Sequence, residues 1–370
     1  MGTLILFIAI LAILVFVHEL GHFLVAKRSG IRVDEFGLGF PPRIWGIKKG
    51  ETLYSINAIP FGGFVKIFGE NPDEEAVSGE DSKRSFINQN RMTQAAVLVA
   101  GVTFNLLFAW FLFALMFMVG FPASAYDNDR VTNASVMITS VRPDSPAMSA
   151  GITPGDTIER IEYTSGGLGV ILEGEALSVE SVMEAIQANG TSELLLTVSR
   201  GGESVTLPAK PEEGIVSDGV ALGVSLDFIG TLKVAPHVAI GYGFIQVRDM
   251  ITMIIVSLSD LFVGAIKGEQ NVLDQVTGPV GIVGLVGDAS RLGWVYLINF
   301  TAMISIHLAI INLVPFPALD GGRLLFVGIE AVTRKRIPMM IANYANAIGF
   351  FILLGLMFIV TISDIARLSF

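Results

Sequence analysis

Four stretches of this chain are long and apolar enough to cross a lipid bilayer as helices, and they constrain its fold more than any other feature. A helix needs about 20 predominantly apolar residues to span the hydrocarbon core. The composition agrees, because 52% of the residues are apolar and only 16% are charged. We therefore expect a polytopic α-helical membrane protein with four transmembrane helices, within residues 1–26, 93–120, 296–320 and 341–362.

Two stretches allow another interpretation. The first apolar run could be a signal peptide, but it lacks a basic amino-terminal region and an A-x-A cleavage site, and the charged HELGH sequence interrupts it. The segment 233–295 contains an apolar run, 234–266, that could be a fifth span. Arg248, Asp249 and Asp260 interrupt this run, and the two aspartates share one helical face. We expect an interfacial amphipathic helix and a connector, with a fifth span as the alternative.

The distribution of basic residues predicts the orientation. Cytoplasmic loops near helix ends are enriched in lysine and arginine. Residues 27–92 carry ten of them and residues 321–340 carry four, whereas residues 121–290 carry eight beside twenty-one acids. We therefore expect the first two segments in the cytoplasm, and both termini together with residues 121–232 outside it.

The segment 27–92 has the pattern of short strands. Apolar and β-branched residues alternate through ETLYSINAI and GGFVKIF, with Gly and Pro between them. Unpaired strand edges are unstable in lipid, so this membrane-associated β-rich loop should lie at the interface or against the helices. An exposed edge in residues 51–68 could hold an extended substrate by strand addition. Packing at the membrane interface alone is the alternative.

Residues 121–232 should form a separate α+β domain. VMITSV and ALGVSL alternate as strands, and SVESVMEAIQANG has helical spacing with Ser181 and Glu184 as a capping pair. The pattern SPA..AGI.PGD.I..I resembles PDZ domains of bacterial envelope proteases. Such domains bind extended peptides at a sheet edge, so the resemblance implies a peptide ligand. A purely structural spacer is the alternative.

The sequence HELGH predicts a metal site. His18 and His22 lie on one face of a helix, and Glu19 lies beside them to transfer a proton. The chain has four histidines and no cysteine, so a metal must be held by histidine and carboxylate. The alternative is a pair of solvated or packed histidines. An apolar helix disfavours that alternative, because ionisable groups in lipid are costly unless they are paired, ligated or hydrated.

A catalytic zinc needs a third protein ligand. Asp320 is the best candidate, because it is the only acid within residues 289–329 and follows an apolar span. Pro315 and Pro317 cannot continue that helix and would present Asp320 from a non-helical stretch. His307, in the same span, is the alternative third ligand.

HELGH in the first span and NLVPFPALDGG at 312–322 together resemble the site-2 protease family of intramembrane zinc metalloproteases. The order of FGLGFPP, IPFGGFVKIFGE, a span, one PDZ-like domain and GPVGI is similar to its bacterial regulator-of-sigma-E protease-like branch. The resemblance implies Zn²⁺ on His18, His22 and Asp320, with Glu19 as general base. It also implies contacts to the substrate backbone from the candidate substrate-binding residues Asn312, Pro315, Pro317, Gly62 and Gly63.

The resemblance implies a function as well. It is the hydrolysis of peptide bonds within transmembrane segments of pre-trimmed single-span proteins of the bacterial cytoplasmic membrane, as in regulated intramembrane proteolysis such as anti-sigma factor cleavage. Processing of signal-peptide remnants is an alternative, and a catalytically silent PDZ scaffold, which would not need Glu19, is another. A metal transporter would need several histidines or acids along consecutive spans, whereas these spans offer one cluster, which argues against that class of protein. The net charge of -10 argues against a nucleic-acid partner.

Overall fold

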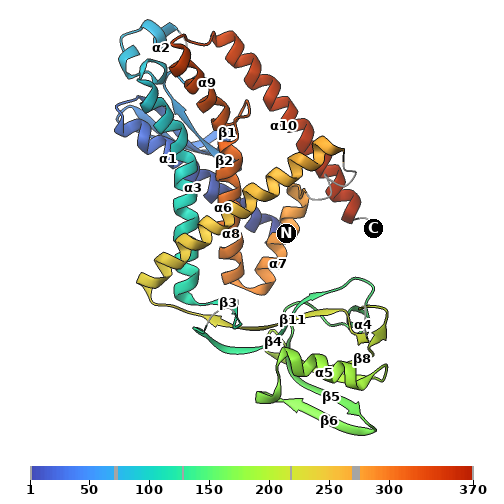
Figure 1. Cartoon of the computed structure of the whole chain (residues 1–370). Helices are drawn as coiled ribbons and strands as arrows, with labels where there is room; N and C mark the ends of the chain where they lie inside the picture. The colour runs from blue at the N-terminus through green and yellow to red at the C-terminus, as the bar shows by residue number, and fades with distance from the viewer. Residues whose placement is uncertain (1, 71–73, 127–128, 217–218, 269–275, 369–370) are drawn as a thin grey trace. The chain divides into compact units, whose positions relative to one another are not determined.

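The chain folds into two compact units, which are described separately. The structure is a computed structural model that describes residues 2–70, 74–126, 129–216, 219–268 and 276–368. The first unit comprises Met1–Met116 and His237–Phe370, and the second comprises Phe117–Pro236. Figure 1 shows the first unit as mainly helical and the second as mainly strands.

Four helices of the chain are long and apolar enough to cross a membrane. They are α1 (Gly2–Arg28), α3 (Arg91–Val119), α8 (Trp294–Leu313) and α10 (Met339–Leu368). The four predicted spans are thereby confirmed as helices. The helix in the third predicted span ends at Leu313 rather than at residue 320, because the prolines that follow lack the N–H group that a helix needs.

Helix α6 (Pro236–Lys267) occupies the stretch for which an interfacial helix is expected. Among the described residues it is not one of the helices that are apolar enough to span. It packs against α3, since the indole N–H of Trp110 donates to the carbonyl of Ile240 over 2.9 Å. Gly243 lies against the backbone of Ala114, where a Cβ would meet the amide nitrogen at 2.9 Å. The depth of α6 in a membrane stays a prediction.

Helix α7 (Pro279–Leu292) lies in the connector, where the sequence predicts no helix. The buried carboxylate of Asp364 in α10 caps it by accepting hydrogen bonds from the N–H groups of Gly278 (3.1 Å) and Gly281 (2.8 Å). The first N–H groups of a helix have no partner inside the helix, so a carboxylate there is stabilising. This cap comes from a residue more than 80 positions away in the sequence.

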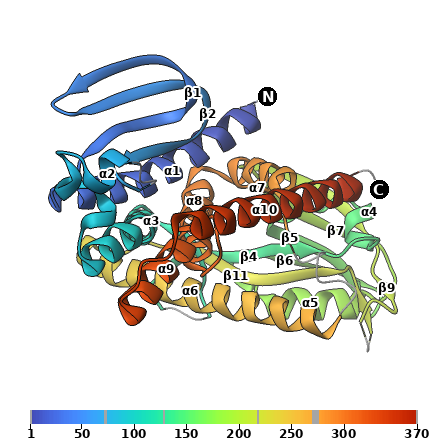
Figure 2. The ribbon, with the colours of Figure 1, turned by 90° about the horizontal axis from the view of Figure 1, so that it is seen from above.

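The two strands β1 (Val33–Lys49) and β2 (Thr52–Ile67) form an antiparallel pair that folds over on itself. Glu35 of β1 lies opposite both Lys66 and Leu53 of β2, so the first part of β1 pairs on both of its sides. The pair therefore makes four adjacent strand segments, and the last part of β2 forms one edge. In both views the pair lies beside α1 (Figures 1 and 2). The β-rich loop between the first two spans is confirmed.

Shorter elements complete the first unit. After β2 come α2 (Glu74–Ser78) and the two 3-10 turns η1 (Ser82–Arg84) and η2 (Phe86–Asn88), which lead into α3. Helix α9 (Asp320–Thr333) lies between α8 and α10. The predicted cytoplasmic loop 321–340 is therefore mostly helical.

The second unit is an α+β domain with one seven-stranded sheet of order β3-β11-β4-β5-β7-β8, in which β6 pairs with β5. Its helices are α4 (Pro146–Ser149) and α5 (Val179–Asn189), with a 3-10 turn η3 (Gly174–Ala176). Its strands are β3 (Phe121–Ser124), β4 (Val131–Val141), β5 (Thr157–Ser165), β6 (Leu168–Glu173), β7 (Leu194–Arg200), β8 (Glu203–Ala209), β9 (Glu212–Glu213), β10 (Val220–Ala221) and β11 (Val224–Leu232).

Helix α5 begins earlier than its predicted cap. Ser178 Oγ accepts from the N–H of Ser181 and Ser181 Oγ accepts from the N–H of Ser178, which makes a reciprocal capping box. The predicted pair, Ser181 with Glu184, is thus one turn too late. The residues that face the sheet are unaffected, since Val182 and Ile186 are buried in the core of this domain.

Candidate active site

Two histidines of α1 and the first residue of α9 meet at one point. The Nε2 atoms of His18 and His22 lie 3.1 Å apart, and Asp320 Oδ2 lies 3.0 Å from the first and 3.2 Å from the second. The three ligand atoms lie within 4.8 Å of one another, a spacing that fits one metal ion. Both histidines are buried, and the Asp320 side chain is 23% exposed. The structure thus brings together the three residues that the sequence predicts.

The turn before α9 delivers Asp320 to this point. The chain turns between α8 and α9, where Ala318 adopts a left-handed conformation (φ 75°). Gly321 then lies against the end of α8, where a Cβ would come within 2.2 Å of the Val314 carbonyl oxygen. A Cβ on Gly322 would come within 2.3 Å of the Phe316 oxygen. The two glycines after Asp320 are therefore needed for α9 to begin this close to the end of α8 and the turn that follows it.

The second nitrogen of each imidazole is held by α3. The Nδ1 atom of His22 lies 2.8 Å from the carbonyl oxygen of Val97, to which it donates. His18 Nδ1 lies 3.2 Å from the side-chain amide nitrogen of Asn105, whose own Oδ1 is buried with no partner among the described residues. If the side-chain amide of Asn105 is rotated by 180°, its Oδ1 takes the place of the nitrogen and accepts a hydrogen bond from the Nδ1–H of His18. A bound metal ion would replace the Nε2 protons that hydrogen-bond Asp320 and leave the Nδ1 protons in place, as ligation through Nε2 requires.

The electrostatics suit a ligand carboxylate. Burial alone would raise the pKa of Asp320. The hydrogen bonds from His18 and His22 oppose this effect and hold the pKa of Asp320 well below its ordinary value. The carboxylate is therefore ionised at neutral pH, as a metal ligand must be.

Helix α3 approaches the ligands so closely that only glycine fits at its nearest point. A Cβ on Gly101 would lie 2.4 Å from His22 Nε2 and 2.8 Å from His18 Nε2. Gly21 of α1 allows the same approach from the other side, since its Cβ would meet the Ala100 carbonyl oxygen at 2.5 Å. The space over the two imidazoles is thus kept open by the absence of a side chain. The two imidazoles and the Asp320 carboxylate together match the donor set of a catalytic zinc.

Glu19 lies beside the ligands, in the wall of a cavity of about 280 Å³. His22, Asp320 and the last part of β2 line the same cavity, together with residues of α9 and α10. Glu19 Oε2 accepts a hydrogen bond from the backbone N–H of Val65 over 3.0 Å. Since Val65 lies on the strand segment at the edge of the β1–β2 sheet, this bond anchors the carboxylate to that edge.

The predicted substrate-binding residues lie in two places. Gly62 and Gly63 are buried on β2, and a Cβ on Gly63 would lie 3.9 Å from Cγ of Glu19. The other three lie at or after the end of α8 and do not line the cavity of Glu19: Asn312, Pro315 and Pro317. A role in substrate binding stays a prediction for all five.

His307, the alternative third ligand, lies elsewhere. Its Nδ1 atom is 2.9 Å from the carbonyl oxygen of Met303, one turn earlier in its own helix. It is not part of the three-residue cluster. The geometry therefore favours Asp320 as the third ligand.

Several residues of this site were not predicted. Asn105 and Gly101 of α3 contact or approach the imidazoles, and Arg323 and Asn346 line the cavity. A polar residue inside an apolar span is a signal for function, so Asn105 could have been selected from the sequence. Gly101 had no such signal, because glycine is frequent in membrane helices.

We expect Gly101→Ala to lower zinc affinity by at least about tenfold, because the added methyl group occupies the space over both imidazoles. The measurement is the zinc content of the purified protein at controlled free zinc. Gly355→Ala, on the transmembrane helix α10, is the matched control, because a Cβ there meets nothing within 4 Å. Equal zinc content in the Gly101→Ala and Gly355→Ala proteins would contradict this account of the site.

Comparison with known proteins identifies the family. The model of peptidase family M50 matches residues 6–356. The chain is 33% identical to a putative zinc metalloprotease of Clostridium perfringens over 95% of both chains, and 32% identical to one of Clostridium acetobutylicum over 97% of this chain and 96% of the relative. It is 30% identical to the zinc metalloprotease RasP of Oceanobacillus iheyensis over the whole of both chains. The chain therefore belongs to peptidase family M50, the site-2 protease family of membrane zinc metalloproteases, as its sequence predicts.

Proposed function

We propose that this protein hydrolyses peptide bonds within the transmembrane segments of single-span membrane proteins. The observation that carries the proposal is the convergence of His18, His22 and Asp320 beside Glu19, because α1, which carries His18, Glu19 and His22, is apolar enough to cross a membrane. Regulated intramembrane proteolysis, in which a first cut trims the substrate and this enzyme makes the second, is the process that such a site would serve.

The roles of the side chains follow from their positions. A zinc ion held by the three ligands would polarise the scissile carbonyl and lower the pKa of a water molecule to about 7. Glu19 is placed to accept the proton of the attacking water and return it to the departing amine. The N–H of Val65 orients the Glu19 carboxylate. Asn105 and the Val97 carbonyl fix the ring orientations of the two histidines.

The strand edge beside Glu19 supports capture of an extended substrate. The carbonyls of a helix are already hydrogen-bonded, so a transmembrane segment must open locally before it can be cut. The strand segment with Gly63 and Val65 pairs with β1 on one side and lines the cavity with the other. An opened segment could add to this edge as a further strand and so pass the ligands in extended form. Gly62 and Gly63 would allow its backbone to approach closely.

Glu19→Gln should lower the rate of cleavage of a transmembrane test peptide by at least about 10²-fold, because the amide cannot accept the water proton. The protein should retain its zinc. Asp320→Ala should lose zinc and cleavage together. The measurements are turnover and zinc content of the purified proteins in detergent or lipid. Turnover of the Glu19→Gln protein comparable to that of the wild type would refute the proposed mechanism.

We further propose that both termini and the second unit lie outside the cytoplasm, as the lysine and arginine distribution predicts. In this cysteine-free chain, single cysteines can be labelled with a membrane-impermeant reagent. Ser192→Cys and Ser290→Cys should react in intact cells, whereas Ser78→Cys should react only after permeabilisation. All three serines are exposed. Reaction of only one of the first two from outside would show that α6 spans the membrane and would reject this topology.

The second unit is proposed to select substrates and to take no part in bond breaking. It contains no histidine, and a groove of about 310 Å³ runs between α5 and the strands β10 and β11. Val179, Met183 and Ile186 of α5 line the groove, which suits an extended peptide. A domain of this kind could bind a peptide ligand or obstruct substrates with bulky outer domains.

Excision of residues 121–232 tests this proposal. The residues on either side of the excised segment are already neighbours, because the N–H of Val234 donates to the carbonyl of Phe117 over 3.1 Å. A short linker therefore suffices. The excised enzyme should cut a trimmed substrate as the full chain does, and should also cut an untrimmed one. Both substrates are compared in one membrane preparation. If the excised enzyme retains zinc and cuts neither substrate, the domain is required for capture or catalysis, and the selection hypothesis is wrong.

A further inference from the structure

Arg323 is a cation in the wall of the proposed catalytic cavity. The residues that line this cavity include one arginine, Arg323, and no lysine. They also include three acids, Glu19, Glu70 and Asp320. It follows Asp320 by three residues on α9, so the two side chains lie on the same face of the helix, with Cβ atoms about 5–6 Å apart. Its guanidinium forms an ion pair with Glu70, which follows the end of β2.

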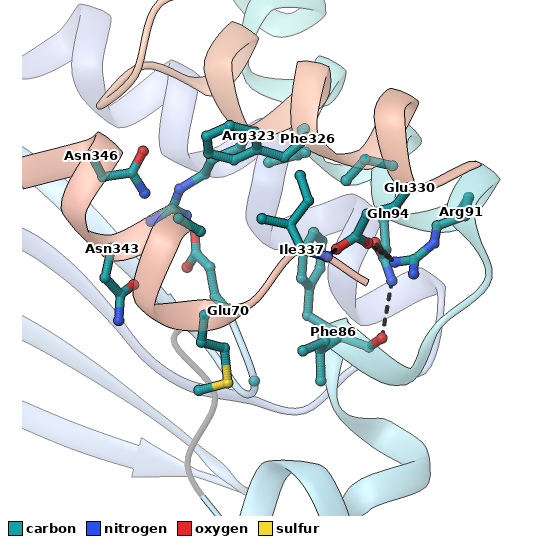
Figure 3. Close-up of a pocket in the computed structure, with 16 residues that line it drawn as sticks. Glu70, Phe86, Arg91, Gln94, Arg323, Phe326, Glu330, Ile337, Asn343 and Asn346 are labelled. Carbon is teal, nitrogen blue, oxygen red and sulfur yellow. Dashed lines mark hydrogen bonds and ion pairs between the residues drawn. The ribbon is translucent and has the colours of Figure 1, made fainter. Parts of the chain in front are cut away.

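This ion pair lies between two cavities. The catalytic cavity and a second, smaller one of about 120 Å³ share five lining residues. The shared residues are Glu70, Phe86, Leu98, Arg323 and Asn346. Figure 3 shows the second cavity, with Arg323 and Glu70 pointing toward each other on one side and Arg91 and Glu330 on the other. Arg91 and Glu330 form a separate ion pair at 2.7 Å, and neither residue lines the catalytic cavity.

Peptide hydrolysis creates an anion in the first of these cavities. The C–N bond breaks, the water oxygen joins the carbonyl carbon, and a water proton goes to the departing nitrogen. At neutral pH the products are a carboxylate on one peptide and an ammonium group on the other. The new carboxylate arises beside Glu19 and Asp320, and repulsion from these two acids favours its movement toward a nearby cation. Arg323 is the cation that this wall offers.

We propose that Arg323 binds the carboxylate at the new C-terminus of the cleaved segment, in exchange for Glu70, and so draws this product away from the metal ligands toward the second cavity. The inference rests on the proposed proteolytic function. A guanidinium binds a peptide carboxylate with the same paired geometry that it offers to a glutamate. The exchange of one carboxylate for another keeps the half-buried guanidinium paired throughout. Arg323 is thus a product-binding residue.

The two members of the ion pair should have opposite effects if this is correct. Glu70 is tethered beside Arg323 and therefore competes with the product at a high effective concentration. Removal of Glu70 should strengthen product binding, whereas removal of Arg323 should weaken it. A purely structural role for the ion pair would give the same direction for both, since either substitution breaks the same contact.

The experiment measures binding of a synthetic peptide, the N-terminal product of a transmembrane test substrate, made with either a C-terminal carboxylate or a C-terminal carboxamide. Metal-stripped protein is used, so that zinc does not contribute to the preference for the carboxylate. We expect the full-length wild type to prefer the carboxylate about threefold, Glu70→Gln to prefer it about tenfold or more, and Arg323→Gln to show no preference. Any carboxylate binding by the second unit is common to all variants and cancels in the comparison.

Glu330→Gln is the matched control, because it breaks the other ion pair of the second cavity and should keep the wild-type preference. Arg323→Lys retains the positive charge but lacks the paired N–H donors of a guanidinium, so it should retain part of the preference for the carboxylate. A preference that is unchanged in Arg323→Gln, or that falls in Glu70→Gln, would overturn the inference. If the wild type with zinc does not cut the test substrate, the proposed function itself fails, and this outcome is distinct from a change in the carboxylate preference.

Discussion

The arrangement of the first unit depends on one costly requirement, which is to keep two imidazoles and a carboxylate together among apolar helices. Ionisable groups in such surroundings are stable only when they are paired, ligated or hydrated. Here His18, His22 and Asp320 contact one another, and the remaining imidazole nitrogens contact Val97 and Asn105 of α3. Three elements far apart in the sequence, α1, α3 and α9, are therefore held in one place.

Glycines make this convergence sterically possible. Gly21 and Gly101 let α1 and α3 approach until backbone and imidazole atoms leave no room for a Cβ. Gly321 likewise leaves room where α9 begins against the end of α8. Close packing of small residues is a general way to associate helices in lipid, where burial of apolar side chains gives little driving force. In this protein the same packing also leaves space for a metal ion above the histidines.

The β1–β2 sheet connects the helices to the proposed chemistry. Its edge segment binds Glu19 through Val65, and the chain that follows reaches Arg323 through Glu70. The cavity is thus bounded by the proposed general base, the residues of the metal cluster, a strand edge and a cation. In the proposed reaction these groups would act in succession: the edge would hold an opened substrate, Glu19 would activate water, and Arg323 would receive the anionic product.

The sequence by itself determined the four spans, the β-rich loop, the second domain and the residues of the metal cluster. Each of these depends on local patterns, namely apolar length, strand alternation, the i, i+4 spacing in HELGH and the single acid, Asp320, that follows the third apolar span. Only the tertiary structure decided the rest. The cap of α7 by Asp364, the contacts of Asn105 and Gly101 with the histidines, and the pairing of Glu70 with Arg323 join residues about 80 to 250 positions apart. No local pattern encodes such contacts, because they arise only when helices pack and bring their side chains to one point.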